Sequence, residues 1–340
     1  MCTAISYKNE FFGRTFDYHK SFGERILITP RNFLQIGKGK NQYAMIGVGV
    51  KDGETPLYFD AMNEHGLFAA ALNFRGCALY GVQNGRGVGV SSSHFISFVL
   101  GYFKSVSELR DLEGELWITP EGVGGAEPTP LHWMVCDGSE CIVIESTKDG
   151  LAFYDNNIGV LTNSPNFAFF KTRMQDFASL HPSNADNLMF DYEKNSNYPY
   201  SHSLGALGLP GDYSSVSRFA KAAFVSKYIR HVGSCIGGLA EGHSEKEATE
   251  AEDLKKGKIN SFFRIMSSVS VPFGCSMGEN NMPMLTFYTV CADPSEGKYY
   301  FNDYNCAEIR FVRFSEKYFN VDRLISFDLY RAICFKEIGE

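Results

Sequence analysis

Short apolar segments separated by turn residues dominate the first third of the chain and predict β-strands there. Residues 25–29 end at a proline, residues 43–50 are rich in Ile and Val, and residues 56–60 form a further short segment. Residues 63–66 have the composition of a turn, so we expect the segment before them to pair with the apolar run 67–74 as a hairpin.

Helical spacing of apolar residues begins near residue 94, and Ser105 with Glu108 has the spacing of a capping box before a second short helix. Around an Asp-Gly turn, residues 131–136 and 141–145 are predicted to form another hairpin, which the segment 151–154 extends as a meander. Further on, the pattern predicts helices at 217–232 and 260–266, and strands at 285–292, 298–302 and 308–314.

Two stretches lack a clear period. Residues 166–212 are rich in Tyr, Asn, Ser, Gly and Pro, and a long irregular stretch of this kind is usually functional or disordered; its aromatic residues favour ordered packing. Residues 241–258 are dense in charge and are expected to form a solvated helix face or loop. Strands and helices that alternate in blocks predict an α+β fold with mainly antiparallel sheets, as one compact unit over residues 1–340.

Composition and charge exclude several classes of function. The chain is 44% hydrophobic and 21% charged, with a formal net charge of -7, so it has no basic stripe and nucleic acid is not expected as a partner. The longest apolar stretch, 94–103, is too short to cross a bilayer, so no membrane association is expected. The N-terminus has no secretory pattern, and we therefore expect a cytoplasmic protein.

The nine cysteines are odd in number and include no C-x-x-C pair, which favours neither a disulfide framework nor a zinc site. We expect no metal. Cys136 and Cys141 flank a turn and could touch, although two ordinary buried strand residues are the simpler expectation. Cys2 differs from the others by its position.

If Met1 is removed, Cys2 carries both a thiol and a free α-amine. The unperturbed pKa is about 7.7–8.0 for the amine and about 8.5 for the thiol, so the amine can take up the thiol proton near neutral pH. Such a nucleophile needs no separate histidine. A papain-like pair of a cysteine and a histidine is the alternative, although His132 lies in an apolar strand and is expected to be a core residue.

Arg14 and Asp17 follow Cys2 at a distance that fits one tight hairpin returning beside the first strand. There, Arg14 would favour the Cys2 thiolate, and Asp17 could orient the terminal amine. The alternative is a surface ion pair worth roughly 0–1 kcal/mol.

Several ordered blocks of sequence resemble the choloylglycine hydrolase family, the N-terminal nucleophile hydrolases that include conjugated bile salt hydrolases and penicillin V acylases. The resemblance covers residues 2–219 well and the rest more loosely. Its blocks are Cys2, residues 12–17 (FGRTFD), 29–33, 58–60, 63–67, 72–74 (LNF), 131–133, 161–165 (LTNSP), 208–212 (GLPGD) and 217–219 (SRF).

The resemblance implies a four-layer αββα sandwich of two antiparallel sheets flanked by helices, with Met1 removed and Cys2 at the start of a central strand. It implies that the Asn73 backbone and the Asn163 side chain form an oxyanion hole, and that Arg218 lies at the catalytic centre. From the sequence alone, residues 163–165 also fit simple turn chemistry and Arg218 an exposed helix end. Arg14 and Arg218 around one thiolate would attract a carboxylate-bearing substrate.

The implied activity is cofactor-free hydrolysis of the amide between an apolar acyl group and a small amino acid. Asn73 favours glycine- or taurine-conjugated bile acids over penicillin V or another N-acyl amide. We expect an apolar pocket from Phe16, Tyr18, Phe59 and Phe74, and a homotetramer assembled through 166–212. A glutamine amidotransferase would need an acceptor domain for which there is little room, and a purely structural protein would leave Cys2 inert.

Overall fold

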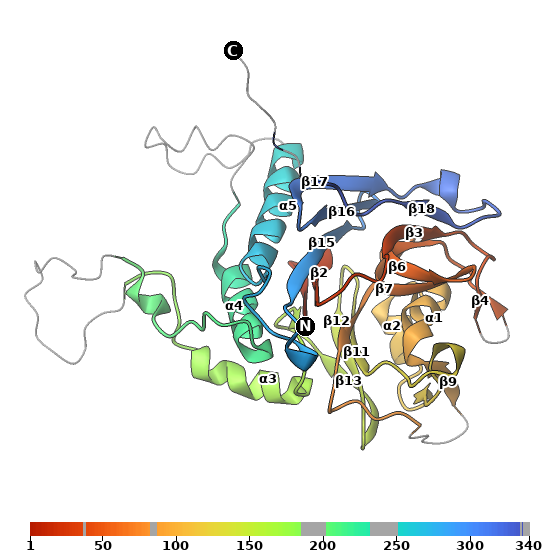
Figure 1. Cartoon of the computed structure of the whole chain (residues 1–340), viewed down its shortest axis with the longest axis horizontal. Helices are drawn as coiled ribbons and strands as arrows, with labels where there is room; N and C mark the ends of the chain where they lie inside the picture. Colours follow the sequence, from red (N-terminus) through yellow and green to blue (C-terminus); the bar gives the residue numbers. More distant parts are fainter. Residues whose placement is uncertain (37–38, 82–86, 185–201, 232–250, 334, 336–340) are drawn as a thin grey trace, which may run out of the picture.

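The fold is described from a computed structural model of the chain, which covers all residues except 37–38, 82–86, 185–201, 232–250, 334 and 336–340. Two antiparallel sheets lie face to face and helices cover their outer sides (Figure 1). This arrangement confirms the αββα expectation.

The first sheet has six strands and contains the N-terminus at its centre. Its order is β14-β1-β2-β15-β16-β17, and every neighbouring pair is antiparallel. The strands are β1 (Cys2–Tyr7), β2 (Phe11–Tyr18), β14 (Val160–Leu161), β15 (Leu285–Asp293), β16 (Lys298–Asp303) and β17 (Cys306–Arg313). The strand that carries Cys2, β1, therefore lies between β14 from the middle of the chain and β2, and the C-terminal strands β15, β16 and β17 follow beyond β2.

The second sheet has eight strands in the order β13-β12-β11-β8-β7-β6-β3-β18. Its strands are β3 (Arg25–Thr29), β6 (Met45–Asp52), β7 (Thr55–Asn63), β8 (Phe68–Asn73), β11 (Leu131–Cys136), β12 (Cys141–Thr147), β13 (Gly150–Asp155) and β18 (Ile325–Phe327). Two small ladders accompany it, an antiparallel one of β4 (Gln35–Ile36) with β5 (Gly39–Lys40) and a parallel one of β9 (Val88–Ser91) with β10 (Leu116–Thr119).

Helices form the two outer layers. On the side of the second sheet lie α1 (Phe95–Tyr102) and α2 (Val106–Arg110), and on the side of the first sheet lie α3 (Phe167–Arg173), α4 (Ser215–Tyr228) and α5 (Ala251–Ser267), as Figure 1 shows. One buried apolar cluster fills the space between the sheets and under α4 and α5, and a second one lies under α1. None of the helices in the described residues has the length and apolarity needed to cross a membrane.

The packing of the first sheet explains a glycine beside the site. A Cβ added to Gly13 would lie 1.9 Å from the carbonyl oxygen of Val290 and 2.9 Å from the ring of Phe262. The backbone of β2 therefore runs so close to β15 and α5 that only glycine fits there.

The predicted strands, both hairpins and the helices near 94, 217 and 260 are confirmed. At the start of α2, the Ser105 hydroxyl accepts a hydrogen bond from the Glu108 amide at 3.2 Å, as its cap spacing predicts. The absence of a period over 166–212 concealed α3, whose first turn is capped by Asn166. Residues 185–201 of that stretch and residues 241–250 of the charged run lie outside the described residues.

Candidate active site

The β1–β2 hairpin divides the site residues between its two faces. Cys2 stands opposite Phe16 and Ala4 opposite Arg14 in the antiparallel register, which confirms the expected hairpin. Because side chains alternate along a strand, Cys2, Arg14 and Phe16 share the face toward the second sheet. Residues 3, 15 and 17 share the opposite face, toward α4.

On the face between the sheets, Arg14 is held against the Cys2 sulfur. Its Nη2 donates to Cys2 Sγ, while its Nη1 donates to the carbonyl oxygens of Ala71 and of Phe59, the latter at 3.1 Å. Its Nε donates to the Thr15 carbonyl oxygen at 3.1 Å. The guanidinium is only 1% exposed, so it places an almost unscreened positive charge beside a thiol that is itself 5% exposed.

A buried carboxylate, Asp60, stands behind Arg14. Its Oδ2 lies 3.9 Å from Arg14 Nε and accepts a hydrogen bond from the Tyr288 hydroxyl at 2.9 Å, and the Tyr299 hydroxyl donates to its Oδ1. Burial raises the pKa of the Asp60 carboxyl, although Arg14 and the tyrosines oppose the rise. Burial alone would lower the pKa of Arg14, but negative charge on Cys2 and Asp60 outweighs it and raises that pKa.

On the opposite face, Arg218 binds the backbone and not the sulfur. Its Nη1 donates to the Cys2 carbonyl oxygen and to Thr3 Oγ1 at 2.7 Å, and its Nη2 donates to Asn163 Oδ1 at 2.7 Å. Asp17 Oδ2 lies 3.8 Å from Nη1. Burial lowers the pKa of Arg218, while Asp17 and Cys2 act against that effect.

This position bears on the expectation that both arginines attract a substrate carboxylate, because only Arg14 borders the cavity beside Cys2. Arg218 is 1% exposed, its three nitrogens are engaged, and it is not among the residues that line the cavity beside Cys2. Arg218 therefore holds the backbone of Cys2 and the side chain of Asn163 in place.

The start of α4 holds Arg218 in place. Ser214 caps the helix, and Asp212 accepts hydrogen bonds from the Ser214 amide at 2.7 Å and from the Ser217 hydroxyl at 2.6 Å. These bonds lower the pKa of Asp212 to about 2. The block 208–212 thus serves the site indirectly, by fixing the helix that carries Arg218.

Asn163 joins the two faces. Its Oδ1 accepts from the Cys2 backbone nitrogen at 2.8 Å, and its Nδ2 donates to the Asn73 carbonyl oxygen at 2.9 Å. The Ser215 hydroxyl accepts from the Asn163 backbone nitrogen at 2.9 Å, which fixes the loop. The structure therefore brings Asn73, Asn163 and Cys2 together.

The amine of Met1 donates to the Asp17 carbonyl oxygen at 2.7 Å. Burial lowers its pKa from 8.0; nearby Arg218 and Arg14 act in the same direction, and Cys2 and Asp17 act against it. The Asp17 carboxylate accepts from Thr286 Oγ1 at 2.6 Å and from Thr15 Oγ1 at 3.2 Å. The Met1 amine at this end of β1 is thus held in a buried environment with charges of both signs nearby.

A buried histidine supports the Asn163 segment from behind. His132 Nδ1 lies 3.0 Å from Glu145 Oε1, and its Nε2 lies 2.9 Å from the Thr162 carbonyl oxygen. Glu145 also accepts from the Phe167 amide at 3.0 Å, so the pair fixes the start of α3. His132 is a core residue, as expected, and both of its nitrogens are used, which leaves it unavailable as a base for Cys2.

An apolar cavity of about 220 Å³ opens beside Cys2 and Arg14. Of the predicted pocket residues, Phe16, Tyr18 and Phe59 line it, and the Phe16 and Phe59 rings stack with centroids 5.0 Å apart. Phe74 does not line it: its side chain is fully buried and stacks on His132 at 4.3 Å. The cavity is completed by residues that the sequence analysis did not name, Phe22, Val50, Leu57, Tyr58, Ala71, Ser93, Thr129 and Leu131.

Two antiparallel sheets between helices, with a cysteine beginning a central strand, define the N-terminal nucleophile class of hydrolases. A family model described as linear amide C–N hydrolases, choloylglycine hydrolase family, matches residues 2–240 and 243–327. The chain belongs to this family and is an amidohydrolase of the choloylglycine hydrolase type.

Individual relatives agree with this assignment. A bile salt hydrolase/transferase from Lactiplantibacillus plantarum is 37% identical over 336 residues, which cover 97% of each chain. The crystal structure of a mutant conjugated bile acid hydrolase from Clostridium perfringens has a TM-score of 0.83 at 27% identity, with 100% of both chains covered. A penicillin V acylase from Agrobacterium tumefaciens shares the fold, with a TM-score of 0.69, 19% identity and coverage of 96% and 91%.

Proposed function

We propose that this chain hydrolyses the amide bond of glycine- or taurine-conjugated bile acids, with Cys2 as nucleophile. The observation that carries the proposal is the setting of Cys2: Arg14 contacts its sulfur, Asn163 holds its backbone nitrogen at 2.8 Å, and an apolar cavity opens beside both. The cavity suits the apolar acyl part of such a substrate.

In this proposal, Met1 is first removed, so that the Cys2 nitrogen becomes the free amine. The amine takes the thiol proton, and the thiolate attacks the carbonyl carbon of the substrate. Nδ2 of Asn163 and the backbone of Asn73 stabilise the oxyanion, each donor being worth about 10²–10³ in rate. The protonated amine then gives its proton to the leaving nitrogen as the C–N bond breaks, and a water activated by the same amine hydrolyses the thioester.

The substrate assignment rests on two supports. The bile acid relatives are 37% and 29% identical to the chain over nearly its full length, whereas the penicillin V acylase, at 19% identity, is a likeness of fold. Asn73 is the residue that favours a conjugated bile acid. Hydrolysis of penicillin V or of another N-acyl amide by the same machinery is the second candidate.

The test incubates the chain with taurocholate, glycocholate and penicillin V and measures release of amine or of the free side-chain acid. We expect turnover of the bile acids, and Cys2→Ala should abolish it while leaving the fold unchanged. Intact-mass measurement should find Met1 absent from active protein. Full activity in protein that retains Met1 would overturn the mechanism, and turnover of penicillin V alone would overturn the substrate.

We also propose a single catalytic domain over 1–340 and a homotetramer assembled through 166–212, in a cytoplasmic location. Native mass measurement tests the assembly, and a monomeric active enzyme would contradict it. Fractionation of cells that make the protein tests its location.

A further inference from the structure

The β11–β12 hairpin brings two cysteines face to face at its turn. Cys136 ends β11, Cys141 begins β12, and the two are directly opposed in the register. The Asp137 amide donates to the Glu140 carbonyl oxygen at 2.9 Å and closes the turn, so the adjacent cysteine pair is a non-hydrogen-bonded pair. Opposed residues of that kind stand about 4.5 Å apart at Cα, within the range of roughly 4.4–6.8 Å that disulfides span.

The turn is held rigidly in this geometry. Asp137 Oδ1 accepts from the amides of Ser139 at 2.7 Å and Glu140 at 2.8 Å, and its Oδ2 accepts from the Val106 amide at 2.8 Å, which ties the turn to α2. Both cysteines are free thiols, and their sulfurs lie 2.6 Å apart. A bond between the sulfurs therefore requires almost no movement of the backbone.

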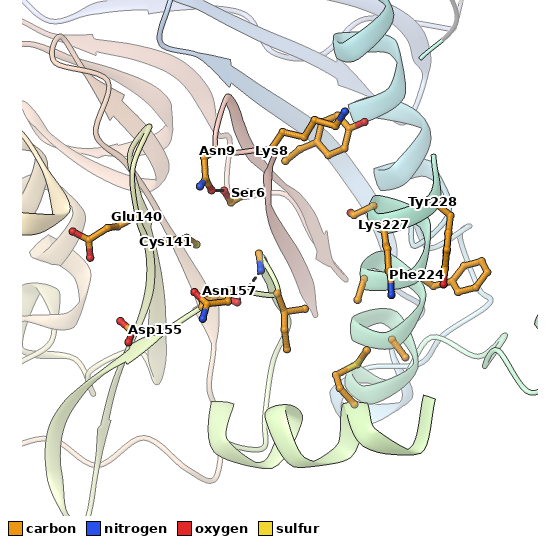
Figure 2. A pocket seen from close by; sticks show the side chains of 18 of the residues that line it. Ser6, Lys8, Asn9, Glu140, Cys141, Asp155, Asn157, Phe224, Lys227 and Tyr228 are labelled. Carbon is orange, nitrogen blue, oxygen red and sulfur yellow. Dashed lines mark hydrogen bonds between the residues drawn. The ribbon is translucent and has the colours of Figure 1, made fainter. Parts of the chain in front are cut away.

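The two thiols differ in access. Cys136 is fully buried, and burial raises the pKa of its thiol, as does its hydrogen bond to Cys141. Cys141 is partly exposed and lines a cavity of about 740 Å³ between the β1–β2 turn, the β12–β13 hairpin and α4 (Figure 2). A small reagent from solvent therefore reaches Cys141 first, and the buried Cys136 sulfur lies next to the Cys141 sulfur.

This pair is separate from the catalytic sulfur. Ser6, which interacts with the Cys136 thiol, is four residues along β1 from Cys2. At a rise of about 3.3 Å per residue, the two sites are roughly 13 Å apart along the strand. Cys2 opens on the apolar cavity, whereas Cys141 opens on the cavity of Figure 2.

We propose that Cys136 and Cys141 form a redox modification site that a peroxide converts into an intramolecular disulfide. Cys141 sulfur attacks one peroxide oxygen, the O–O bond breaks, and water leaves to give a sulfenic acid. Cys136 sulfur then attacks the Cys141 sulfur, the S–S bond forms, and the S–O bond breaks with loss of a second water. The two thiols together supply the two electrons that reduce one peroxide, and an external dithiol reverses the change.

The chain offers a direct test by peptide mapping. Cleavage after lysine and arginine gives one peptide, residues 111–148, which contains Cys136 and Cys141 and no other cysteine. After brief treatment with hydrogen peroxide, the protein is alkylated in denaturant and digested. We expect neither cysteine of this peptide to carry an alkyl group, and the peptide to be lighter than its dithiol form by two hydrogen atoms. Reduction with dithiothreitol should restore both thiols.

Variants locate the chemistry. Cys136→Ser should stop Cys141 at a sulfenic or more oxidised state, and Cys141→Ser should leave Cys136 alkylatable. Cys291→Ser, which removes another fully buried thiol, serves as the matched control and should leave the disulfide yield unchanged. Cys2→Ala should also leave it unchanged, so failure of the proposed hydrolase function would not affect this result.

The unmodified chain alone can overturn the inference. If both cysteines of peptide 111–148 remain fully alkylatable at peroxide doses that oxidise Cys2, the pair is not a modification site. A disulfide that links this peptide to another part of the chain would equally contradict the proposal.

Discussion

A buried arginine lies close to a buried aspartate on each face of the β1–β2 ladder, but the two pairs make different contacts. Between the sheets, Arg14 lies 3.9 Å from Asp60, and on the helix side, Arg218 lies 3.8 Å from Asp17; all four side chains are buried. Arg14 touches the sulfur and borders the cavity, whereas Arg218 binds main chain and Asn163. The Arg14–Asp60 pair therefore lies beside the Cys2 sulfur, and the Arg218–Asp17 pair lies beside the backbone that carries it.

The surroundings of the two guanidiniums differ in the same sense. At Arg14, negative charge on Cys2 and Asp60 outweighs burial and raises the pKa, whereas at Arg218 burial prevails and lowers the pKa. The space between the sheets is thus richer in groups that carry or share negative charge. Arg14 would stabilise a thiolate on Cys2, and the negative charge of Asp60 already balances part of the positive charge of Arg14.

The largest expected effect comes from Arg14→Met. It removes the cation at the sulfur and leaves Asp60 buried without its partner, so we expect unfolding to become easier by about 3–5 kcal/mol. Turnover should fall on the order of 10³, in the range of a lost electrostatic stabiliser. Urea melts alongside kinetics separate the two losses.

The control for Arg14→Met is the double variant with Asp60→Asn. Neutralising the carboxylate should restore most of the stability and none of the turnover, because the sulfur still lacks its cation. Recovery of turnover together with stability would show that Arg14 acts only through folding, and would remove the distinction between the two faces.

A smaller loss is expected from Arg218→Lys. The ammonium keeps a positive charge but cannot reproduce the fork that binds Cys2, Thr3 and Asn163 at once. We expect kcat to fall by about 10² through misplaced oxyanion donors, with KM nearly unchanged because Arg218 does not border the cavity. A rise in KM with unchanged kcat would instead make Arg218 a substrate contact.

The pH profile sharpens the comparison further. Burial chiefly lowers the pKa of the Met1 amine from 8.0, and we expect the same direction for the Cys2 amine that replaces it, one residue further along β1. Because the neutral amine is the base, kcat/KM should be retained down to a pH below 8.0 and lost as the pH falls through the lowered pKa. Arg218 contributes more to this lowering than Arg14 does, so Arg218→Met should move the acid limb to higher pH.

The value of kcat/KM for Arg218→Met as a function of pH, measured at substrate concentrations well below KM, checks this direction. An acid limb that stays in place would mean that Arg218 does not act on the amine electrostatically. A limb that moves to lower pH would contradict the sign of the argument.

Local patterns in the sequence were sufficient for most of the fold and for the first strand pair of the site. Turn residues and alternation predicted both hairpins of the second sheet, and the spacing from Cys2 to Arg14 predicted the hairpin that returns Arg14 beside the first strand. These features depend on residues that are close along the chain. The roles of Asn73, Asn163 and Arg218 came from the family resemblance and not from any local pattern.

The residues that the sequence analysis missed act through contacts between distant segments. Asp60 becomes a partner of Arg14 only because β15 and β16 bring Tyr288 and Tyr299 against it. Glu145 belongs to the site only because the fold places His132 and the start of α3 in contact with its carboxylate. Phe74 was assigned to the pocket because it follows Asn73, but it lies just after the end of β8 and its ring stacks on His132.

The smallest expected effect concerns substrate contact on the face between the sheets. Phe22 lies at the cavity mouth, where it is 45% exposed, and its ring packs on Tyr18 at 5.2 Å. Phe22→Ala should raise KM for an apolar acyl substrate by roughly tenfold, since about 1–2 kcal/mol of apolar contact is lost, with little change in unfolding. Phe74→Ala is the matched control, because it should lower the free energy of unfolding by about 3–5 kcal/mol and leave KM unchanged in the folded fraction. If Phe74→Ala raised KM and Phe22→Ala did not, the acyl group would lie on the side of His132, and the cavity beside Arg14 would not be the substrate site.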